Sequence, residues 1–380
     1  MPSTRPLLLA RAFYFCYFGA VGCYVPFINL YFRSIGLSGA AIGTLAALPP
    51  LILLAAGPLW GAAGDRFRIH RFLLPMAALG PIVPVLLMTR TENFAALLAL
   101  VAWAALFVAP IVPLIDSAVL DLLPGTALSY GKVRVWGSLG FSAVTWLVGL
   151  LLERAGLHWL FYAYALMLGL SGLLAFGLPA RRQAWRVSFR ASLRQLLSNR
   201  ALSLFLIGSF LIGAALQAAY SFYPLYLESL GGSTAWIGLG SALAAITETP
   251  VVFFSAVLFG WIGVRGSVLL SCVMFALRWA ILALVPAPVP VLLTNAMHGL
   301  TFAPFLVGSI AYVERHTPPG LSATAQGLLT AASFGLGAAA GALGGGYLYD
   351  RLGPAGMFGV GAATALMATG FVLAAGGKTK

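Results

Sequence analysis

The sequence predicts an all-α membrane protein with twelve transmembrane helices in two pseudo-symmetric six-helix bundles. Apolar residues make up 61% of the 380-residue chain and charged residues only 8%, whereas soluble proteins carry about 25% charged residues. Runs such as residues 96–115 carry no charge over about 20 residues, the length that a helix needs to cross a ~30 Å hydrocarbon core. Helices are expected because they satisfy their own backbone hydrogen bonds, which lipid cannot do.

Twelve apolar runs, separated by charged or Gly- and Pro-containing turns, follow one another along the chain. They are expected near residues 10–32, 41–63, 72–89, 94–119, 133–152, 157–178, 201–226, 235–260, 267–286, 288–312, 322–348 and 354–375. The N-terminal stretch lacks a small-residue cleavage site after a short apolar core, so the first run is read as a retained span.

The basic residues orient these spans, since cytoplasmic loops are enriched in Lys and Arg. With the N-terminus inside, four of the 22 Lys and Arg residues fall outside (Arg33, Arg90, Arg154 and Arg351), Arg278 lies within a span, and the other 17 are cytoplasmic. The prediction is therefore a multi-pass protein of the cell (inner) membrane with both termini in the cytoplasm.

The two halves of the chain resemble each other in sequence. LYFRSIGLSGAAIG (30–43) matches LYLESLGGSTAWIG (225–238) at eight of fourteen positions, at an offset of 195 residues. In both halves this segment falls at the outer turn between the first and second spans. The organisation predicted is an N-terminal bundle over residues 1–179, a basic cytoplasmic linker over 180–200 and a C-terminal bundle over 201–380. Parallel six-helix repeats are typical of transporters whose substrate site lies between the halves.

Other classes fit the composition less well. The net charge of +13 would suit nucleic acid, but the basic residues sit in short segments between apolar runs. Cys16, Cys23 and Cys272 all fall within apolar spans, which predicts neither a disulfide framework nor a metal site. No cofactor is expected, and the protein is predicted to be a monomer whose partners are a small-molecule substrate, protons and the bilayer.

Three ionisable residues reach similar depth within spans of the second half. Glu248, Arg278 and His298 lie 10 to 13 residues into three different spans, so at about 15–20 Å from the membrane surface. Such groups are costly in hydrocarbon and are functional candidates by default. A carboxylate, a guanidinium and an imidazole together suit proton-coupled binding, because protonation can rearrange their contacts. A static packing network remains the alternative.

Asp116 and Arg134 are the candidates in the first half, with Phe141 two turns beyond Arg134 on the same predicted helix. A simple count along the helix places the acid and the base near the cytoplasmic end, where they could form an interfacial ion pair that contributes little. Pro110 and Pro113 lie upstream and can kink the helix, so a site for solute is the other reading. Tyr24, Gln217 and Tyr220 are further candidates to face a solute.

The loop GPLWGAAGDRFRIHR (57–71) resembles the signature of the major facilitator superfamily through Gly61, Asp65, Arg66 and Arg71, and implies a cytoplasmic gating loop. PIVPLIDSAVLD, YGKVRVWGS, ALRWAIL and MHGLTFAPFL resemble, over nearly the whole chain, the subgroup that contains phenylpropionate permease and, more distantly, lactose permease. The resemblance implies that Asp116 and Arg134 bind substrate, that Phe141 stacks on it, and that Arg278 and His298 belong to the coupling network.

The chain departs from lactose permease at three positions. Thr301 stands where that permease carries its proton-bearing glutamate, Glu248 lies about one turn later than the sugar-site glutamate, and Phe141 replaces a tryptophan. Glu248, with His298 second, is the proton carrier that these departures leave.

The function predicted is secondary active transport of a small organic solute by alternating access, as proton-coupled symport of a small carboxylate, sugar or nucleoside. The alternative is proton-coupled efflux of amphipathic compounds. An enzyme is not expected, because the sequence has no Walker-type glycine loop, HExxH or GxSxG.

Overall fold

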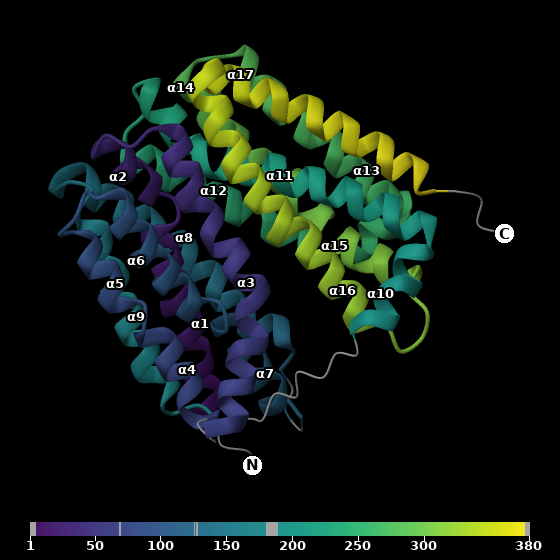
Figure 1. The fold of residues 1–380 in the computed structure, drawn as a ribbon, viewed down its shortest axis with the longest axis horizontal. Helices are drawn as coiled ribbons and strands as arrows, with labels where there is room; N and C mark the ends of the chain where they lie inside the picture. The colour runs from purple at the N-terminus through teal and green to yellow at the C-terminus, as the bar shows by residue number, and fades with distance from the viewer. Residues whose placement is uncertain (1–4, 68–69, 125, 127, 180–188, 377–380) are drawn as a thin grey trace. The chain divides into compact units, whose positions relative to one another are not determined.

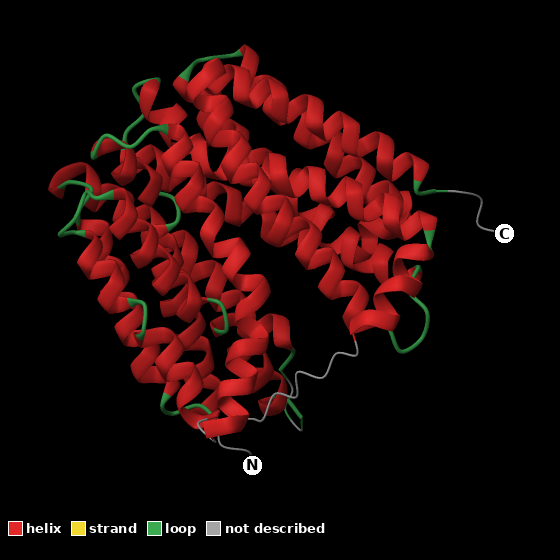
Figure 2. Ribbon diagram, in the orientation of Figure 1, coloured by secondary structure: helices red, strands yellow, loops and turns green. Residues whose placement is uncertain are grey.

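The computed structural model describes residues 5–67, 70–124, 126, 128–179 and 189–376, and every regular element within them is a helix (Figure 2). The first elements in chain order are α1 (Arg5–Tyr24), α2 (Ile28–Ser34), α3 (Gly39–Phe67), α4 (His70–Leu79), α5 (Ile82–Met88), α6 (Phe94–Val108), α7 (Ile111–Leu122), α8 (Tyr130–Ala155) and α9 (Trp159–Ala175). They are followed by α10 (Phe189–Ser198), α11 (Arg200–Ser229), α12 (Thr234–Phe253), α13 (Ser255–Leu284), α14 (Pro288–Leu293), η1 (Thr294–Met297), α15 (His298–Arg315), α16 (Ser322–Thr330), η2 (Ala331–Gly337) and α17 (Ala338–Ala374). Figure 1 labels the α-helices.

Nine helical segments of the described chain are long and apolar enough to cross a membrane, and two shorter apolar ones cover Phe72–Met88 and Trp159–Ala175. The longest segment, Ser322–Ala374, has 53 residues, more than twice the length that one span needs. Its backbone leaves the helical conformation at Gly353, where φ is 70°, so it contains both of the last two predicted spans. The helical membrane-protein class is confirmed, and the count of twelve spans stays a prediction.

Prolines set several of the helix boundaries. The predicted span 94–119 is broken between α6 and α7, with Pro110 at the N-cap of α7, because proline cannot donate the backbone hydrogen bond that would continue α6. Asp116 therefore lies in the second turn of a separate short helix. Its depth cannot be counted along one straight span.

The described chain forms two compact units. The first comprises Met1–Gly36, Leu51–Trp185 and Ser233–Ala242, and the second comprises Leu37–Pro50, Arg186–Gly232 and Leu243–Lys380. Each unit is thus mainly one half of the chain plus the first turns of one helix from the other half, namely α12 in the first unit and α3 in the second.

In the first unit, α1 packs along α8 and α9. Small residues allow close approach of the backbones, as is common between membrane helices. A Cβ at Gly22 would lie 3.0 Å from the carbonyl oxygen of Phe141, and one at Gly140 would overlap the backbone of Phe15. The register between α1 and α8, which carries Arg134 and Phe141, is therefore closely constrained.

In the second unit, α11 packs along α17, and α13 packs against both α17 and α15. The π-helical segment η2 also lies against α11, where a Cβ at Gly213 would overlap the backbone of Ser333. Buried aromatic side chains fill the spaces between these helices, among them Phe275, which stacks on Trp279 with ring centroids 4.8 Å apart.

The repeated sequence segment has the same packing role in both units. In the first unit the start of α12 lies on α8, where the Thr234 hydroxyl donates to the Gly149 carbonyl (2.9 Å) and the Ser233 hydroxyl to Glu153 (3.1 Å). In the second unit the start of α3 lies on α17, where the Asp350 carboxylate accepts hydrogen bonds from the backbone N–H groups of Gly39 and Ala40, each 2.8 Å long. A glycine shared by the two copies permits both approaches, because a Cβ at Gly43 would overlap the backbone of Ala342 on α17 and one at Gly238 would lie 2.7 Å from the carbonyl oxygen of Thr145 on α8.

Candidate functional site

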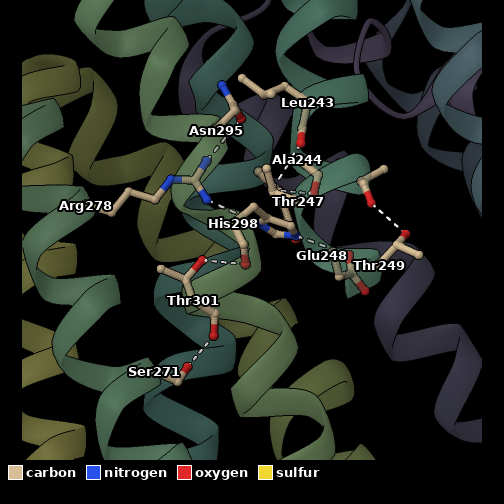
Figure 3. Close-up of polar contacts among 12 residues, drawn as sticks. Leu243, Ala244, Thr247, Glu248, Thr249, Ser271, Arg278, Asn295, His298 and Thr301 are labelled. Carbon is tan, nitrogen blue, oxygen red and sulfur yellow. Dashed lines mark hydrogen bonds and ion pairs between the residues drawn. The ribbon is translucent and has the colours of Figure 1, made fainter. Parts of the chain in front are cut away.

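The second unit holds a connected group of polar side chains from four helices and the 3-10 segment η1. Arg278 on α13 donates from Nη2 to the Asn295 side-chain oxygen (3.1 Å), and its Nη1 lies 3.2 Å from Nδ1 of His298 (Figure 3). Nε2 of His298 lies 3.2 Å from the Tyr220 hydroxyl and 3.6 Å from a carboxylate oxygen of Glu248. The structure therefore brings together Glu248, Arg278 and His298, as the sequence predicts, and adds Tyr220 to them.

The contacts of Arg278 define the proton arrangement on His298. An arginine is charged and has only donors, so Nδ1 of His298 must be the acceptor of their hydrogen bond. A neutral imidazole then carries its proton on Nε2, the nitrogen that faces Glu248 and Tyr220. A second proton on Nδ1 would have to displace Arg278, so protonation of this ring is coupled to the position of the guanidinium.

The group is shielded from solvent to different degrees. Arg278 is 7% exposed and His298 4%, whereas the side chain of Glu248 is 28% exposed. A buried cation needs compensating charge and hydrogen bonds, and Asn295 and His298 supply two of the latter. Glu248 is the most exposed of the three ionisable side chains, and Tyr220 beside it is 44% exposed.

Contacts next to this group hold α12, α13 and α15 in register. The Ser271 hydroxyl on α13 donates to the Thr301 carbonyl on α15, and the Thr301 hydroxyl donates to the His298 carbonyl (3.1 Å) (Figure 3). A Cβ at Gly299 would overlap the backbone of Thr247, so α15 approaches α12 closely beside Glu248. Thr301, at the position of the permease glutamate, thus has a structural contact within its own helix.

Two members of the group, Asn295 and Tyr223, were not predicted from the sequence as site residues. The Asn295 amide donates to the Tyr223 hydroxyl (2.5 Å), and Asn295 is 5% exposed. An asparagine in the apolar run VLLTNAMHG, three residues before His298, was the signal that could have identified it. Gln217, predicted as a solute contact, donates to the Ser221 hydroxyl on its own helix (3.3 Å).

The first unit places Asp116 and Arg134 around the aromatic side chains of α1. The Tyr14 hydroxyl donates to Asp116 (2.5 Å), and the guanidinium of Arg134 lies 3.9 Å from the ring centroid of Phe18 and 5.4 Å from that of Tyr14. The structure gives no ion pair between Asp116 and Arg134, both of which it describes. The interfacial ion pair considered from the sequence is therefore not formed in this structure.

The side chains in this arrangement have hydrogen-bonding groups that suit a polar ligand. A guanidinium that lies over an aromatic ring is held by a cation–π contact, and its N–H donors point outward in the plane of the group. Phe141 lies two turns after Arg134 on α8, so both side chains are on the same face of that helix. Asp116, Arg134 and Phe141 could thus offer an acceptor, a fork of donors and an apolar ring.

Two other predictions have different outcomes. Tyr24 packs on Tyr164 with ring centroids 4.8 Å apart, and its hydroxyl contacts the sulfur of Met88 (3.7 Å), so it lies among α5 and α9. Gly61, Asp65 and Arg66 fall in α3 and Arg71 in α4, and their side chains lie outside the described part of the structure. Residues 180–188 of the predicted linker (180–200) also lie outside the described residues, and α10 (Phe189–Ser198) lies within its remainder.

Comparison with known proteins agrees with this architecture. The sequence model of the MFS_1 like family matches residues 7–360. The chain is 33% identical to maltose permease of Geobacillus stearothermophilus over 341 residues, which cover 89% of this chain and 86% of that protein. It is 28% identical to the probable 3-phenylpropionic acid transporter of Escherichia coli (strain K12) over 336 residues, covering 82% of this chain and 83% of that protein.

Solved structures show the same fold. The crystal structure of nucleoside transporter NupG superimposes with a TM-score of 0.87 at 19% sequence identity, covering 98% of this chain and 99% of that one. These relatives are permeases and transporters rather than enzymes. The chain belongs to the MFS_1 like family, and it is a membrane transporter of the major facilitator superfamily.

Proposed function

We propose that the chain is a proton-coupled symporter that imports a small organic solute by alternating access. The observation that supports this most strongly is the group formed by Glu248, His298 and Arg278, three ionisable side chains in contact within membrane-spanning helices. Ionisable residues at such positions mark proton relays and substrate paths in transporters.

In the proposed coupling, Glu248 carries the proton and His298 transmits its effect. Glu248 is the most exposed of these three ionisable side chains, so it exchanges protons with water, while its charge acts on the imidazole 3.6 Å away. Neutralising Glu248 removes the attraction that orients the Nε2–H of His298. Arg278, bonded to the opposite nitrogen, then loses part of the network that compensates its charge, which favours a different packing of α13 and α15.

The solute site that we propose in the first unit consists of Asp116, Arg134 and Phe141. The relatives are named for maltose, a phenylpropionic acid and nucleosides, which differ in charge but all combine polar groups with an apolar face. An acid, a base and a ring accommodate each of these chemistries, because Arg134 can hold a carboxylate and Asp116 can accept hydrogen bonds from hydroxyl groups.

The proposed topology has an N-terminal bundle (1–179) and a C-terminal bundle (201–380) joined by a basic cytoplasmic linker. Both termini lie in the cytoplasm, the protein is a monomer in the cell (inner) membrane, and the segment that contains Gly61, Asp65, Arg66 and Arg71 gates the cytoplasmic side. The distribution of Lys and Arg supports this orientation.

Reconstituted proteoliposomes test the proposal. Maltose, uridine and 3-phenylpropionate, each radiolabelled, are offered to vesicles with an inward proton gradient, with and without a protonophore. We expect at least one solute to accumulate and the accumulation to vanish when the gradient is collapsed. Accumulation that persists undiminished with the protonophore contradicts symport. Accumulation by inside-out vesicles and not by right-side-out vesicles supports efflux instead.

A further inference from the structure

A cavity lies in the second unit, along α15 on the C-terminal side of His298. It has a volume of about 430 Å³, within the range of small-molecule sites. Residues of α15, α16 and η2 line it: Phe305, Leu306, Ser309, Ile310, Glu314, Gln326, Leu329, Thr330, Ser333 and Phe334. None of the residues of the proposed proton group or of the first unit's solute site is among them.

The wall of this cavity contains two buried hydroxyl groups with no hydrogen-bond partner among the described residues. Ser309 on α15 is 2% exposed and Ser333 on η2 is fully buried. Buried polar groups are nearly always hydrogen-bonded, so each exception needs an explanation. Ser333 also lies in a π-helical segment, and π-helical turns within α-helices are frequent at functional sites.

The other polar groups in the wall leave acceptors available. The Gln326 side-chain amide donates to the Ile310 carbonyl (2.9 Å), so its oxygen remains an acceptor. Glu314 is exposed at the Arg315 end of α15 and accepts a hydrogen bond from Ser322. The ten lining residues include one acid and no basic side chain, which disfavours an anionic ligand.

Aromatic rings connect the cavity to the proton group. The ring of His298 stacks on Phe302 with centroids 5.2 Å apart, and Phe302 contacts Phe334, with centroids 6.3 Å apart. Phe334 lines the cavity. These ring contacts join His298 to the wall of the cavity, which lies nearer the Arg315 end of α15, the cytoplasmic end in the proposed topology.

We infer that this cavity is a second solute site, which takes a neutral molecule with hydroxyl groups and an apolar face, such as a glycoside or a nucleoside, and not a carboxylate. Solute hydroxyls bond to Gln326 and, once the buried Ser309 and Ser333 side chains rotate their hydroxyls into the cavity, to those two serines, while the apolar side chains cover the ring of the solute. The inference rests on the proposed function in that it places this site on the cytoplasmic exit path of an imported solute.

Alkylation of an engineered cysteine tests the site without requiring transport. Thr330 is exposed and lines the cavity, so Thr330→Cys is introduced into protein in which Cys16, Cys23 and Cys272 are replaced by alanine. The rate of reaction with N-ethylmaleimide is measured with maltose, uridine or 3-phenylpropionate. Maltose or uridine should slow the reaction about threefold or more, as expected when a solute is present at about twice its Kd, and 3-phenylpropionate should not.

Two controls separate binding in the cavity from other effects. Ala323→Cys places the reporter at an exposed position of the same helix that does not line the cavity, and its reaction rate should not change with solute. Replacing Ser309 and Ser333 together by alanine should abolish the protection of Thr330→Cys. Ser209→Ala removes a third buried hydroxyl without a partner, which lies outside the cavity, and should leave the protection intact.

Equal reaction rates with and without every solute overturn the inference, as does protection by 3-phenylpropionate alone or protection that survives the double serine substitution. The proposed function fails separately, in the vesicle experiment. Protection of Thr330→Cys without gradient-driven uptake would support the solute site in the cavity and contradict symport. Gradient-driven uptake without protection would support symport and contradict the solute site in the cavity.

Discussion

At the scale of single residues, His298 lies between the guanidinium of Arg278 and the carboxylate of Glu248. One ring nitrogen accepts from Arg278 and the other faces Glu248 and Tyr220. A histidine in this position responds to a change on either side. The proton that it carries in the neutral state is therefore the most informative property of the group.

The contacts predict that neutral His298 is protonated on Nε2. Nitrogen-15 NMR of histidine-labelled protein near neutral pH measures this, because the two tautomers have different ring-nitrogen shifts. The chain has four histidines, so the signal is assigned by its loss in His298→Asn. Arg278→Met should shift the Nδ1 signal of His298, since it removes the donor. A signal showing a proton on Nδ1 of neutral His298 would contradict this reading.

The position of the Arg134 guanidinium depends on its contact with the ring of Phe18. Phe18→Leu removes the cation–π contact at 3.9 Å, which contributes about 0.5–2 kcal/mol according to its exposure, so thermal unfolding in detergent should occur at a lower temperature. Phe18→Tyr keeps a ring and should restore most of the loss. Equal destabilisation by the two substitutions would mean that packing volume, and not the contact with the guanidinium, matters here.

At the scale of helices, close packing depends on where glycine faces a neighbouring backbone. Gly341 and Gly344 lie one turn apart on α17. A Cβ at Gly341 would overlap the backbone of Ala214 on α11, whereas one at Gly344 would have no atom within 4 Å. The same substitution at these two positions therefore separates helix contact from loss of glycine.

Gly341→Val should destabilise the second unit by about 1–3 kcal/mol or more, the usual cost of overpacking, and Gly344→Val should have little effect. The measurement is the midpoint of thermal unfolding together with the yield of monodisperse protein after purification. If Gly344→Val is as harmful as Gly341→Val, the close approach of α11 and α17 is not what requires glycine.

At the scale of the whole molecule, the sequence predicts the class of fold well. Long uncharged runs and a strong excess of apolar residues allow few alternatives to a helical membrane protein. The repeat at an offset of 195 residues identified two equivalent segments, whose helix starts, those of α3 and α12, pack in similar ways in the structure. Helix breaks are less predictable. Pro110 and Pro113 marked a place where their span can kink, but the separation of α14, η1 and α15 just before His298 has no comparable signal.

The candidate sites were predictable in part. Charged residues within apolar runs are conspicuous, so Glu248, Arg278 and His298 could be chosen before their contacts were known. Asn295 was missed because an uncharged amide is less costly in a span and stands out less. Whether Asp116 and Arg134 form an ion pair depends on side-chain geometry around Tyr14 and Phe18, which spacing along the chain does not contain.

The central claim is that Glu248 and its partners couple a proton to solute movement. The most direct test compares two activities of Glu248→Gln in proteoliposomes with a solute that the native protein accumulates. Exchange of labelled for unlabelled solute, which needs no net proton movement, should persist, and accumulation driven by a proton gradient should fall to the level of protein-free vesicles. Accumulation that is fully retained by Glu248→Gln would contradict the claim.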